Sequence, residues 1–216
     1  VYAVGDAVEV RHFVTGAKSH IALAGPANKQ GRIAADHICG RRSAYTGALG
    51  TSVLKLFDLT AASTGLNEKQ ARAAGVAYDK VVTYSASHAS YYPGARNMTV
   101  KTLFDPASGR ILGAQIVGFD GVDKRMDVLA AAIRAGLTAE QLTELDLAYA
   151  PPYGSAKDPV NMAGYVIENV RAGLVEQHHW DAVAELSADG SVILLDVRTP
   201  GEVRKQGLLR SDALHI

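Results

Sequence analysis

The sequence is poor in the residues that build disulfides and metal centres. It contains one cysteine, Cys39, so no disulfide can form within the chain, and we expect a cytoplasmic location. Its seven histidines are scattered, and none takes part in an HxxxH or Cys/His pattern. We therefore predict no metal site. The GxSxG pattern of serine hydrolases and the phosphate-binding P-loop are also absent from the sequence.

Long hydrophobic runs and an excess of one charge are absent too. No segment approaches the roughly 20 consecutive apolar residues of a membrane-spanning helix. The 22 basic and 22 acidic residues leave no net charge, so neither nucleic acid nor a membrane is expected as a partner. With 48% hydrophobic and 20% charged residues, the composition is typical of a folded globular protein. Because the chain opens on a valine inside a strand-like run, we expect it to be part of a longer protein.

Turn signals divide the chain into three predicted parts, which are residues 1–48, 49–176 and 177–216. The middle part is typical of an α+β layer, with antiparallel strands followed by packed helices. Its predicted strands are Thr51–Leu59, Lys80–Ser85, Met98–Phe104 and Ile111–Val117, the last two joined as a hairpin by the turn Asp105–Arg110. Its predicted helices are Asn67–Ala74 with Asn67 as N-cap, a helix after Asp123 as cap, and about Lys157–Ala172.

The first part is predicted to contain a strand end and one helix. Val1–Val4 is apolar and rich in β-branched residues. A helix is expected from about Gly25 to Cys39, because Pro26 suits a first helical turn and Gly40 suits a C-terminal cap. Cys39, late in this helix, is expected to be a buried structural thiol.

The segment VYAVGDA, residues 1–7, is the first candidate binding motif. A strand that ends in Gly5-Asp6 places a backbone without Cβ beside a carboxylate, at the sheet edge where ligands of α/β proteins bind. Gly5 allows close approach of a phosphate, and Asp6 can accept hydrogen bonds from sugar or ribitol hydroxyls. Taken alone, the same residues are equally typical of an ordinary turn.

The segment LAGPANKQGRIAADHI, residues 23–38, opens on a helix N-terminus whose free N–H groups favour negative charge. Together with VYAVGDA it resembles the second flavin-binding signature of the pyridine nucleotide-disulfide oxidoreductase family. The resemblance implies that residues 1–48 end an FAD-binding domain and that 49–176 form the C-terminal dimerisation domain. It also implies that Asp6 contacts the ribitol of FAD and that the Leu23–Ala24 backbone lies near the flavin ring.

Two tyrosine-rich segments, HASYYPGARNM and LAYAPPYGSAKDPVNMAGY, form the third candidate site. A tyrosine hydroxyl can donate a proton to a leaving thiolate, although aromatic packing explains such clusters as well. The sequence of these two segments resembles the coenzyme A disulfide reductase branch of the family. In that branch, two tyrosines reach the partner subunit's active site. The best matches are Tyr91 and Tyr149, with their neighbours Tyr92 and Tyr153 as alternatives.

Two charged segments receive structural interpretations. Lys124 and Arg125, in GVDKRMDVL, lie at a helix start, where two cations can meet an acidic or phosphate group. A solvated charged turn is the simpler interpretation. The segment VILLDVRTPGEV, residues 192–203, resembles the opening of a rhodanese domain, which implies a structural ion pair or cap at Asp196 and Arg198. A helix over Trp180–Leu186 and a buried strand over Ser191–Val197 are predicted there.

The resemblance implies a homodimeric flavoprotein that uses NAD(P)H to reduce a small disulfide such as coenzyme A disulfide. The resemblance further implies that the electrons pass through FAD to a cysteine outside this chain, held as a mixed disulfide with coenzyme A or another small thiol. Three alternatives remain open: an NADH oxidase or peroxidase, a polysulfide or persulfide reductase, and a non-catalytic dimerisation module.

Overall fold

The computed structural model describes residues 1–186, 189, 191–208 and 210–216. The chain forms two compact units, residues 1–175 and 176–216. Within the described residues, no helix is both long and apolar enough to cross a membrane.

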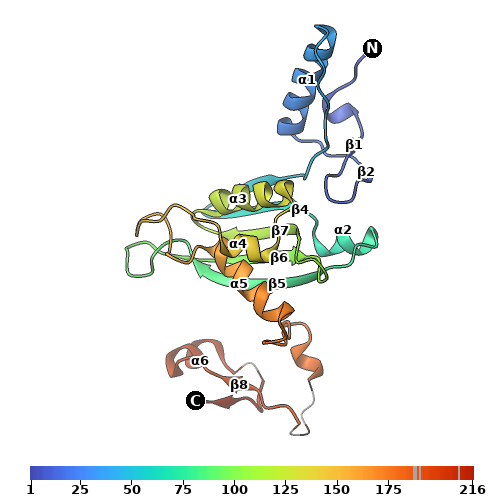
Figure 1. Ribbon diagram of the computed structural model, residues 1–216. Helices are drawn as coiled ribbons and strands as arrows, with labels where there is room; N and C mark the ends of the chain where they lie inside the picture. Colours follow the sequence, from blue (N-terminus) through green and yellow to red (C-terminus); the bar gives the residue numbers. More distant parts are fainter. Residues whose placement is uncertain (187–188, 190, 209) are drawn as a thin grey trace. The chain divides into compact units, whose positions relative to one another are not determined.

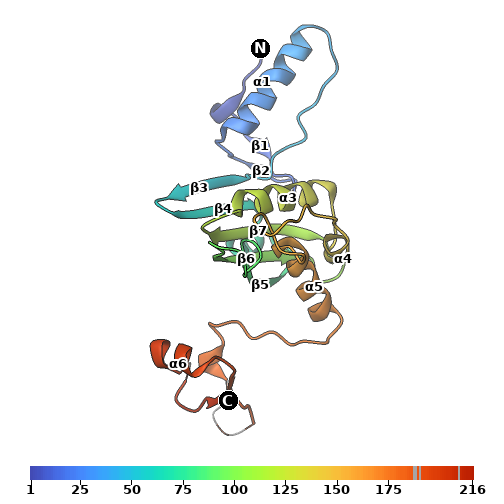
Figure 2. The ribbon, with the colours of Figure 1, turned by 90° about the vertical axis from the view of Figure 1, so that its left-hand side faces the viewer.

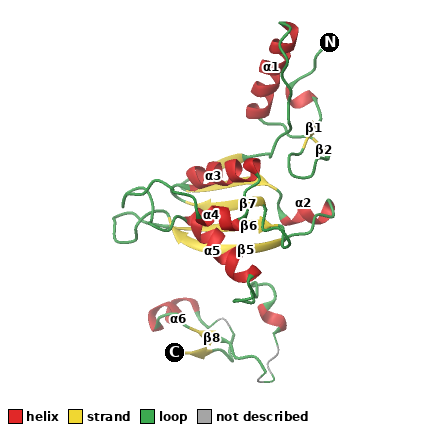
Figure 3. Ribbon diagram, viewed as in Figure 1, coloured by secondary structure: helices red, strands yellow, loops and turns green. Residues whose placement is uncertain are grey.

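A five-stranded antiparallel sheet forms the centre of the first unit (Figures 1 and 3). Its strands, in the order in which they pair, are β3 (Ser52–Leu56), β4 (Leu59–Gly65), β7 (Ile111–Gly118), β6 (Asn97–Phe104) and β5 (Asp79–Ala86). The single strand predicted over Thr51–Leu59 is wrong. Leu56 pairs with Leu59, so Phe57 and Asp58 form a two-residue hairpin turn between β3 and β4.

The predicted hairpin of β6 and β7 is confirmed, and its turn shows why the chain reverses there. The Asp105 carboxylate accepts hydrogen bonds from the N–H groups of Ala107 at 2.8 Å and Ser108 at 3.1 Å. Gly109 then takes the left-handed conformation, with φ of 75°. These local contacts fix the register of strands β6 and β7, in which Thr99 lies opposite Val117 and Val100 opposite Ile116.

Three helices close the main core: the first and third pack on this sheet, and the second packs against the third (Figure 2). They are α3 (Val122–Ala135), α4 (Ala139–Thr143) and α5 (Pro159–Arg171). The predicted cap Asp123 is wrong, because Gly121 holds that position with φ of 65° and Asp123 lies in the first turn. Helix α4 escaped prediction because it has only five residues, although Thr138 and Gln141 form a capping box before it.

Helix α2 (Glu68–Ala73) covers a smaller core cluster beside the sheet. The predicted cap is confirmed: Asn67 accepts a hydrogen bond from the Gln70 N–H, and Gln70 bonds back to the Asn67 N–H. The chain enters α2 so close to β7 that a Cβ on Gly113 would lie 1.9 Å from the Leu66 carbonyl oxygen. Only glycine therefore fits at that position of β7.

The N-terminal segment contains four short or medium elements, which are η1 (Gly5–Ala7), β1 (Val10–Arg11), β2 (Lys18–Ser19) and α1 (Ala24–Ile38). The predicted helix is confirmed within one residue at each end. The strand predicted over Val1–Val4 is wrong, because no strand among the described residues pairs with it and a strand needs such a partner. Cys39, the residue that follows α1, is exposed and not buried as predicted.

The second unit is small and pairs few residues. Its elements are η2 (Val183–Glu185), β8 (Leu195–Asp196), α6 (Pro200–Gln206) and β9 (Leu214–His215), with β8 and β9 parallel. The helix predicted over Trp180–Leu186 is wrong, because only a three-residue 3-10 turn forms there. The buried strand predicted over Ser191–Val197 is wrong as well: two residues pair, and Ile193 is 76% exposed.

Candidate functional site

Two loops place the predicted tyrosines at one end of the sheet. The loop of residues 87–96 joins β5 to β6 and carries Tyr91, whereas the loop of residues 144–158 joins α4 to α5 and carries Tyr149. Figure 1 shows both loops at the end of the sheet opposite α2. They are joined directly, because the Ala89 N–H donates a hydrogen bond to the Pro151 carbonyl at 3.3 Å.

The hydroxyl groups of Tyr91 and Tyr149 form a hydrogen bond of 3.2 Å across the two loops. Both side chains reach solvent, with 75% and 48% of their surface exposed. The hydrogen bond to Tyr91 raises the pKa of the Tyr149 hydroxyl, because it stabilises the protonated form. The pair is therefore a surface site at which two hydroxyl groups from different loops are joined by one hydrogen bond.

The alternative tyrosines lie elsewhere in the same loops. The Tyr92 ring packs edge-on against the His88 ring, with centroids 5.9 Å apart. His88 is buried and is held between the Ser87 hydroxyl and the Pro93 carbonyl. Tyr153 lines a pocket next to Tyr149 and is 72% exposed. Among the four tyrosines, the hydroxyl pair that the structure brings together is the one named as the best match from sequence.

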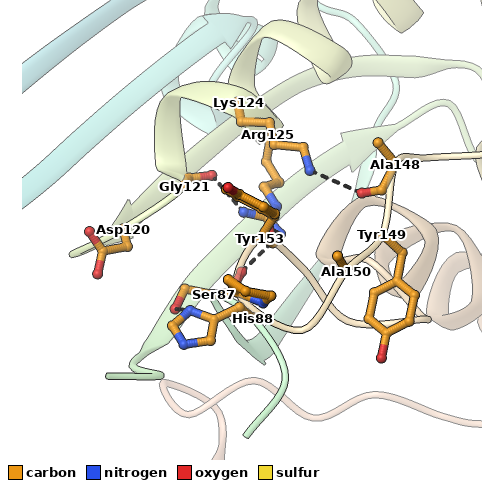
Figure 4. Close-up of a pocket in the computed structure, with 11 residues that line it drawn as sticks. Ser87, His88, Asp120, Gly121, Lys124, Arg125, Ala148, Tyr149, Ala150 and Tyr153 are labelled. Atoms are coloured by element: carbon orange, nitrogen blue, oxygen red, sulfur yellow. Dashed lines mark hydrogen bonds between the residues drawn. The ribbon is translucent and has the colours of Figure 1, made fainter. Parts of the chain in front are cut away.

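An open pocket of about 450 Å³ lies beside Tyr149 (Figure 4). Its polar groups come from His88, Asp120 and Lys124, and its apolar wall comes from Ala148, Ala150 and Pro152. The Lys124 ammonium donates a hydrogen bond to the Ala148 carbonyl at 3.4 Å, directly before Tyr149. The lining therefore combines an apolar wall with two cations, Lys124 and Arg125, and one carboxylate, Asp120.

Arg125 forms the floor of this pocket, and the predicted solvated charged turn is wrong for it. The side chain is 2% exposed and pairs with the Asp158 carboxylate, with Nη2 2.9 Å from Oδ2. The same guanidinium donates hydrogen bonds to the carbonyls of Ser87 at 2.9 Å, Gly121 at 3.2 Å and Tyr153 at 3.4 Å. Arg125 therefore joins helix α3 to both tyrosine loops.

Asp158 ends the loop of Tyr149 and begins α5. Its Oδ1 accepts a hydrogen bond from the Val160 N–H at 3.1 Å, and Asn161 bonds back to the Asp158 N–H. The Asn161 amide also donates to the carbonyls of Leu142 and Leu145, where the loop leaves α4. Both ends of the loop are thus fixed by one capping box, which Pro159 at the first helical position reinforces.

The candidate flavin-binding residues lie in the N-terminal segment, around α1. Gly5 adopts φ of 78° and its N–H donates to the buried Gln30 side chain at 2.7 Å, which holds the turn against the helix. Asp6 is exposed, and its carbonyl accepts a hydrogen bond from His20 Nε2 at 2.6 Å. Leu23 is the N-cap residue of α1, and no side chain caps the first turn that Ala24 begins.

These features fit the group that the sequence implies. The Asp6 carboxylate is free to accept hydroxyl donors, and the uncapped first turn of α1 presents N–H groups toward an anionic or carbonyl-bearing ligand. Gly5 leaves room beside them, since an added Cβ would lie 3.7 Å from the Ala27 Cβ in a backbone conformation that favours glycine.

The fold agrees with comparisons to known proteins. The sequence model of the pyridine nucleotide-disulphide oxidoreductase dimerisation domain matches residues 51–159, half of the chain. The chain belongs to this oxidoreductase family. The predicted reductase dimerisation fold, an antiparallel sheet with packed helices, is thereby confirmed.

Three relatives within the oxidoreductase family illustrate the similarity. Coenzyme A disulfide reductase of Staphylococcus haemolyticus is 39% identical over 166 residues, which cover 76% of this chain and 37% of the relative. Reduced CoADR-RHD of Bacillus anthracis is 50% identical with a TM-score of 0.93, covering 100% of this chain and 38% of that one. An NAD-dependent persulfide reductase from A. fulgidus is 41% identical with a TM-score of 0.89. The match covers 100% of this chain and 38% of the reductase chain. This chain spans less than two fifths of the length of each.

The sequence predicted Tyr91 and Tyr149 as candidate site residues but did not reveal the buried Arg125 and Asp158 beneath them. Arg125 was assigned to solvent because it follows Lys124 in a charged run. Asp158 was placed inside a helix, although the order Asp158, Pro159 and Asn161 is typical of a capped helix start. That capping signal could have located the end of the Tyr149 loop.

Proposed function

We propose that this chain is part of a flavoprotein that uses NAD(P)H to reduce coenzyme A disulfide or a similar small disulfide, through a cysteine outside this chain. The observation that carries the proposal is the exposed hydroxyl pair of Tyr91 and Tyr149. Reduction of a disulfide releases a thiolate, and a thiolate leaves more easily when a nearby acid supplies a proton. The similarity to the staphylococcal coenzyme A disulfide reductase and to the Bacillus anthracis protein supports this choice of substrate.

The two hydroxyls take different roles in this proposal. Tyr91 is the more exposed of the pair and donates its proton to the leaving thiolate. Tyr149 keeps its proton in this proposal and donates a hydrogen bond that stabilises the resulting Tyr91 phenolate. A hydrogen bond to a charged group contributes about 1.5–3 kcal/mol, so Tyr149 lowers the cost of each proton transfer.

The N-terminal segment would hold FAD in the same protein. Asp6 would accept hydrogen bonds from the ribitol, Gly5 would admit the cofactor backbone, and the Leu23–Ala24 turn would face the flavin ring. When bound, FAD supplies the relay of electrons from NAD(P)H to the disulfide.

We further propose that the protein works as a homodimer. Figure 1 shows residues 1–24 apart from the tyrosine loops, which lie at the other end of the sheet. A second subunit can bring the tyrosine pair of one chain to the flavin segment of the other, and the family domain matched here is a dimerisation domain. Sedimentation of the full-length protein is expected to give a dimer, and a catalytically active monomer would contradict this assignment.

The substrate class can be tested on the flavin absorption band of the full-length protein. NADH should bleach the band, and coenzyme A disulfide should restore it. Recovery with a persulfide or polysulfide but not with coenzyme A disulfide would favour the second candidate, to which the A. fulgidus structure points. Recovery with oxygen or peroxide alone would make the protein an oxidase or peroxidase. Absence of a flavin band would leave this chain as a dimerisation module.

The tyrosine roles can be tested by removing each hydroxyl. Tyr91→Phe is expected to lower kcat for coenzyme A disulfide by about 10²-fold or more, the usual contribution of a general acid. Tyr149→Phe should lower it by about 10–100-fold, the equivalent of its hydrogen bond. Tyr84→Phe is a matched control, because Tyr84 is exposed on β5 outside the two loops. Unchanged turnover in both loop variants would refute the assignment.

We also propose that residues 177–216 begin a rhodanese-like domain. In support, β8 and β9 are parallel, and Arg198 forms an ion pair of 2.6 Å with Asp196. The Arg198 hydrogen bonds lower the pKa of the Asp196 carboxyl to about 2. A structure of the full-length protein is expected to extend this pair of strands into a parallel sheet, and an unrelated fold after residue 176 would contradict the proposal.

A further inference from the structure

Arg125 is the largest fully buried side chain described, yet the proposed chemistry assigns it no role. We infer that Arg125 is a positioning residue that holds the hydroxyls of Tyr91 and Tyr149 at reacting distance by joining the roots of their two loops. The inference rests on the proposed function of the tyrosine pair and adds a residue that governs it.

The contacts of the guanidinium link both loops at matched positions. Arg125 Nη2 donates to the carbonyl of Ser87, four residues before Tyr91, and to the carbonyl of Tyr153, four residues after Tyr149. One planar group therefore fixes the backbone of both loops close to the side chains that must meet. Figure 4 shows Arg125 between the segments of Ser87, Gly121 and Tyr153.

The surroundings of Arg125 are shaped for a guanidinium. Asp158 accepts hydrogen bonds from Nε and Nη2, which orients the plane of the group. Gly121 supplies its carbonyl to Nη1, and a Cβ at Gly121 would lie 2.1 Å from that same nitrogen. With φ of 65°, Gly121 is at a position where glycine is favoured on backbone grounds as well.

Lysine cannot replace these contacts. Its ammonium is a compact point charge, whereas Arg125 spreads its donors over a carboxylate and three carbonyls that approach from different directions. Arg125→Lys keeps a positive charge opposite Asp158 but leaves part of the set of carbonyls without a donor. We therefore expect the loops to remain folded, but the distance between the hydroxyl oxygens of Tyr91 and Tyr149 will no longer be fixed.

The test is made on the full-length flavoprotein with coenzyme A disulfide as substrate. Arg125→Lys is expected to lower kcat by about tenfold or more while KM stays within about twofold, since small misplacements of reacting groups act on kcat and a 1 Å error can cost about 10²-fold. Arg171→Lys is the matched control. Arg171 also pairs with a carboxylate, Glu140, and donates to two loop carbonyls, but its turn at Pro106 and Ala107 carries no tyrosine.

The decisive readout repeats Arg125→Lys in a Tyr91→Phe/Tyr149→Phe background. If Arg125 acts through the hydroxyls, the substitution causes no further loss there, because nothing remains to be positioned. The same fold-loss in both backgrounds, or an equal loss from Arg171→Lys, would overturn the inference and leave Arg125 a purely structural residue. Full turnover of the double phenylalanine variant would instead refute the proposed function.

A second variant covers the case in which Arg125→Lys does not fold. Asp158→Asn keeps the shape and the oxygen that caps α5 at Val160, but removes the charge that orients the guanidinium. It is expected to lower kcat in the wild-type background and to have no effect in the double phenylalanine background. An unchanged kcat for folded Asp158→Asn would also overturn the inference.

Discussion

The carboxylate of Glu68 offers a quantitative test of the electrostatics of the sheet domain. Glu68 begins α2 and meets the ammonium groups of Lys101 and of Lys80, the latter at 3.0 Å. Arg72 and the Tyr78 hydroxyl also contact it, at 3.2 and 3.3 Å. Partial burial raises the pKa of the Glu68 carboxyl, but the hydrogen bonds and charges of the two lysines outweigh this and lower it from 4.5 to about 2.

The size of the effect follows from the two pKa values. A carboxyl whose pKa falls from 4.5 to about 2 on folding stabilises the fold at neutral pH by at most about 3 kcal/mol. Lys101 and Arg72 are partly exposed, and solvent screens their share. We therefore expect Glu68→Gln to lower the free energy of unfolding at pH 7 by about 1–2 kcal/mol.

The sign of the pH dependence distinguishes this mechanism from a loss of packing. Because the folded pKa is the lower one, the stabilisation is complete above about pH 5 and is lost as the pH falls toward 2. The difference between Glu68→Gln and the wild type should therefore shrink across that window. A difference that persists unchanged at low pH would refute the electrostatic reasoning.

The assay is urea unfolding of the 216-residue chain, followed by circular dichroism between pH 7 and 3. Fluorescence is unsuitable, because the single tryptophan, Trp180, belongs to the other compact unit. Glu144→Gln is the control: Glu144 is an exposed glutamate of the same unit, and surface substitutions of this kind change stability by less than about 0.5 kcal/mol.

Two further predictions concern packing and capping. Leu129→Ala should destabilise the chain by about 2–5 kcal/mol, because Leu129 is 0% exposed between α3 and the sheet; a loss below about 1 kcal/mol in urea unfolding would contradict that packing. Asn67→Ala should cost about 1 kcal/mol by removing the capping box of α2, and Asn67→Asp, which retains a capping oxygen, should recover most of it in the same assay.

Elements defined by local contacts were predictable from the sequence. The β6–β7 hairpin depends on Asp105 and Gly109 within its own turn, and α2 depends on Asn67 at its own N-terminus. The strand predicted over Val1–Val4, and all of Ser191–Val197 except the paired residues Leu195 and Asp196, failed for the opposite reason. A strand exists only when a neighbour pairs with it, and hydrophobic patterning does not reveal whether that neighbour is present.

The residues of the candidate site, like the strands, depend on contacts between segments that are distant in sequence. Tyr91 and Tyr149 are 58 residues apart, and residue patterns alone did not pair them; the family resemblance did. Arg125 shows the reverse problem, because a charged side chain beside Lys124 suggests solvent exposure. Its burial depends on Asp158, which lies 33 residues away in sequence. No pattern local to residue 125 contains that information.

The buried ion pair also explains how two exposed tyrosines can keep a defined spacing. Exposed loops usually shift at little cost, because water replaces any contact that they lose. Here a shift of either loop would remove a carbonyl acceptor from the buried Arg125 guanidinium, and an unsatisfied buried donor costs about 1–3 kcal/mol or more. The desolvation cost that makes such a pair a weak source of stability makes it an effective restraint. The distance between the Tyr91 and Tyr149 hydroxyls is therefore set by the buried Arg125 guanidinium, because neither loop can shift without depriving that group of a hydrogen-bond acceptor.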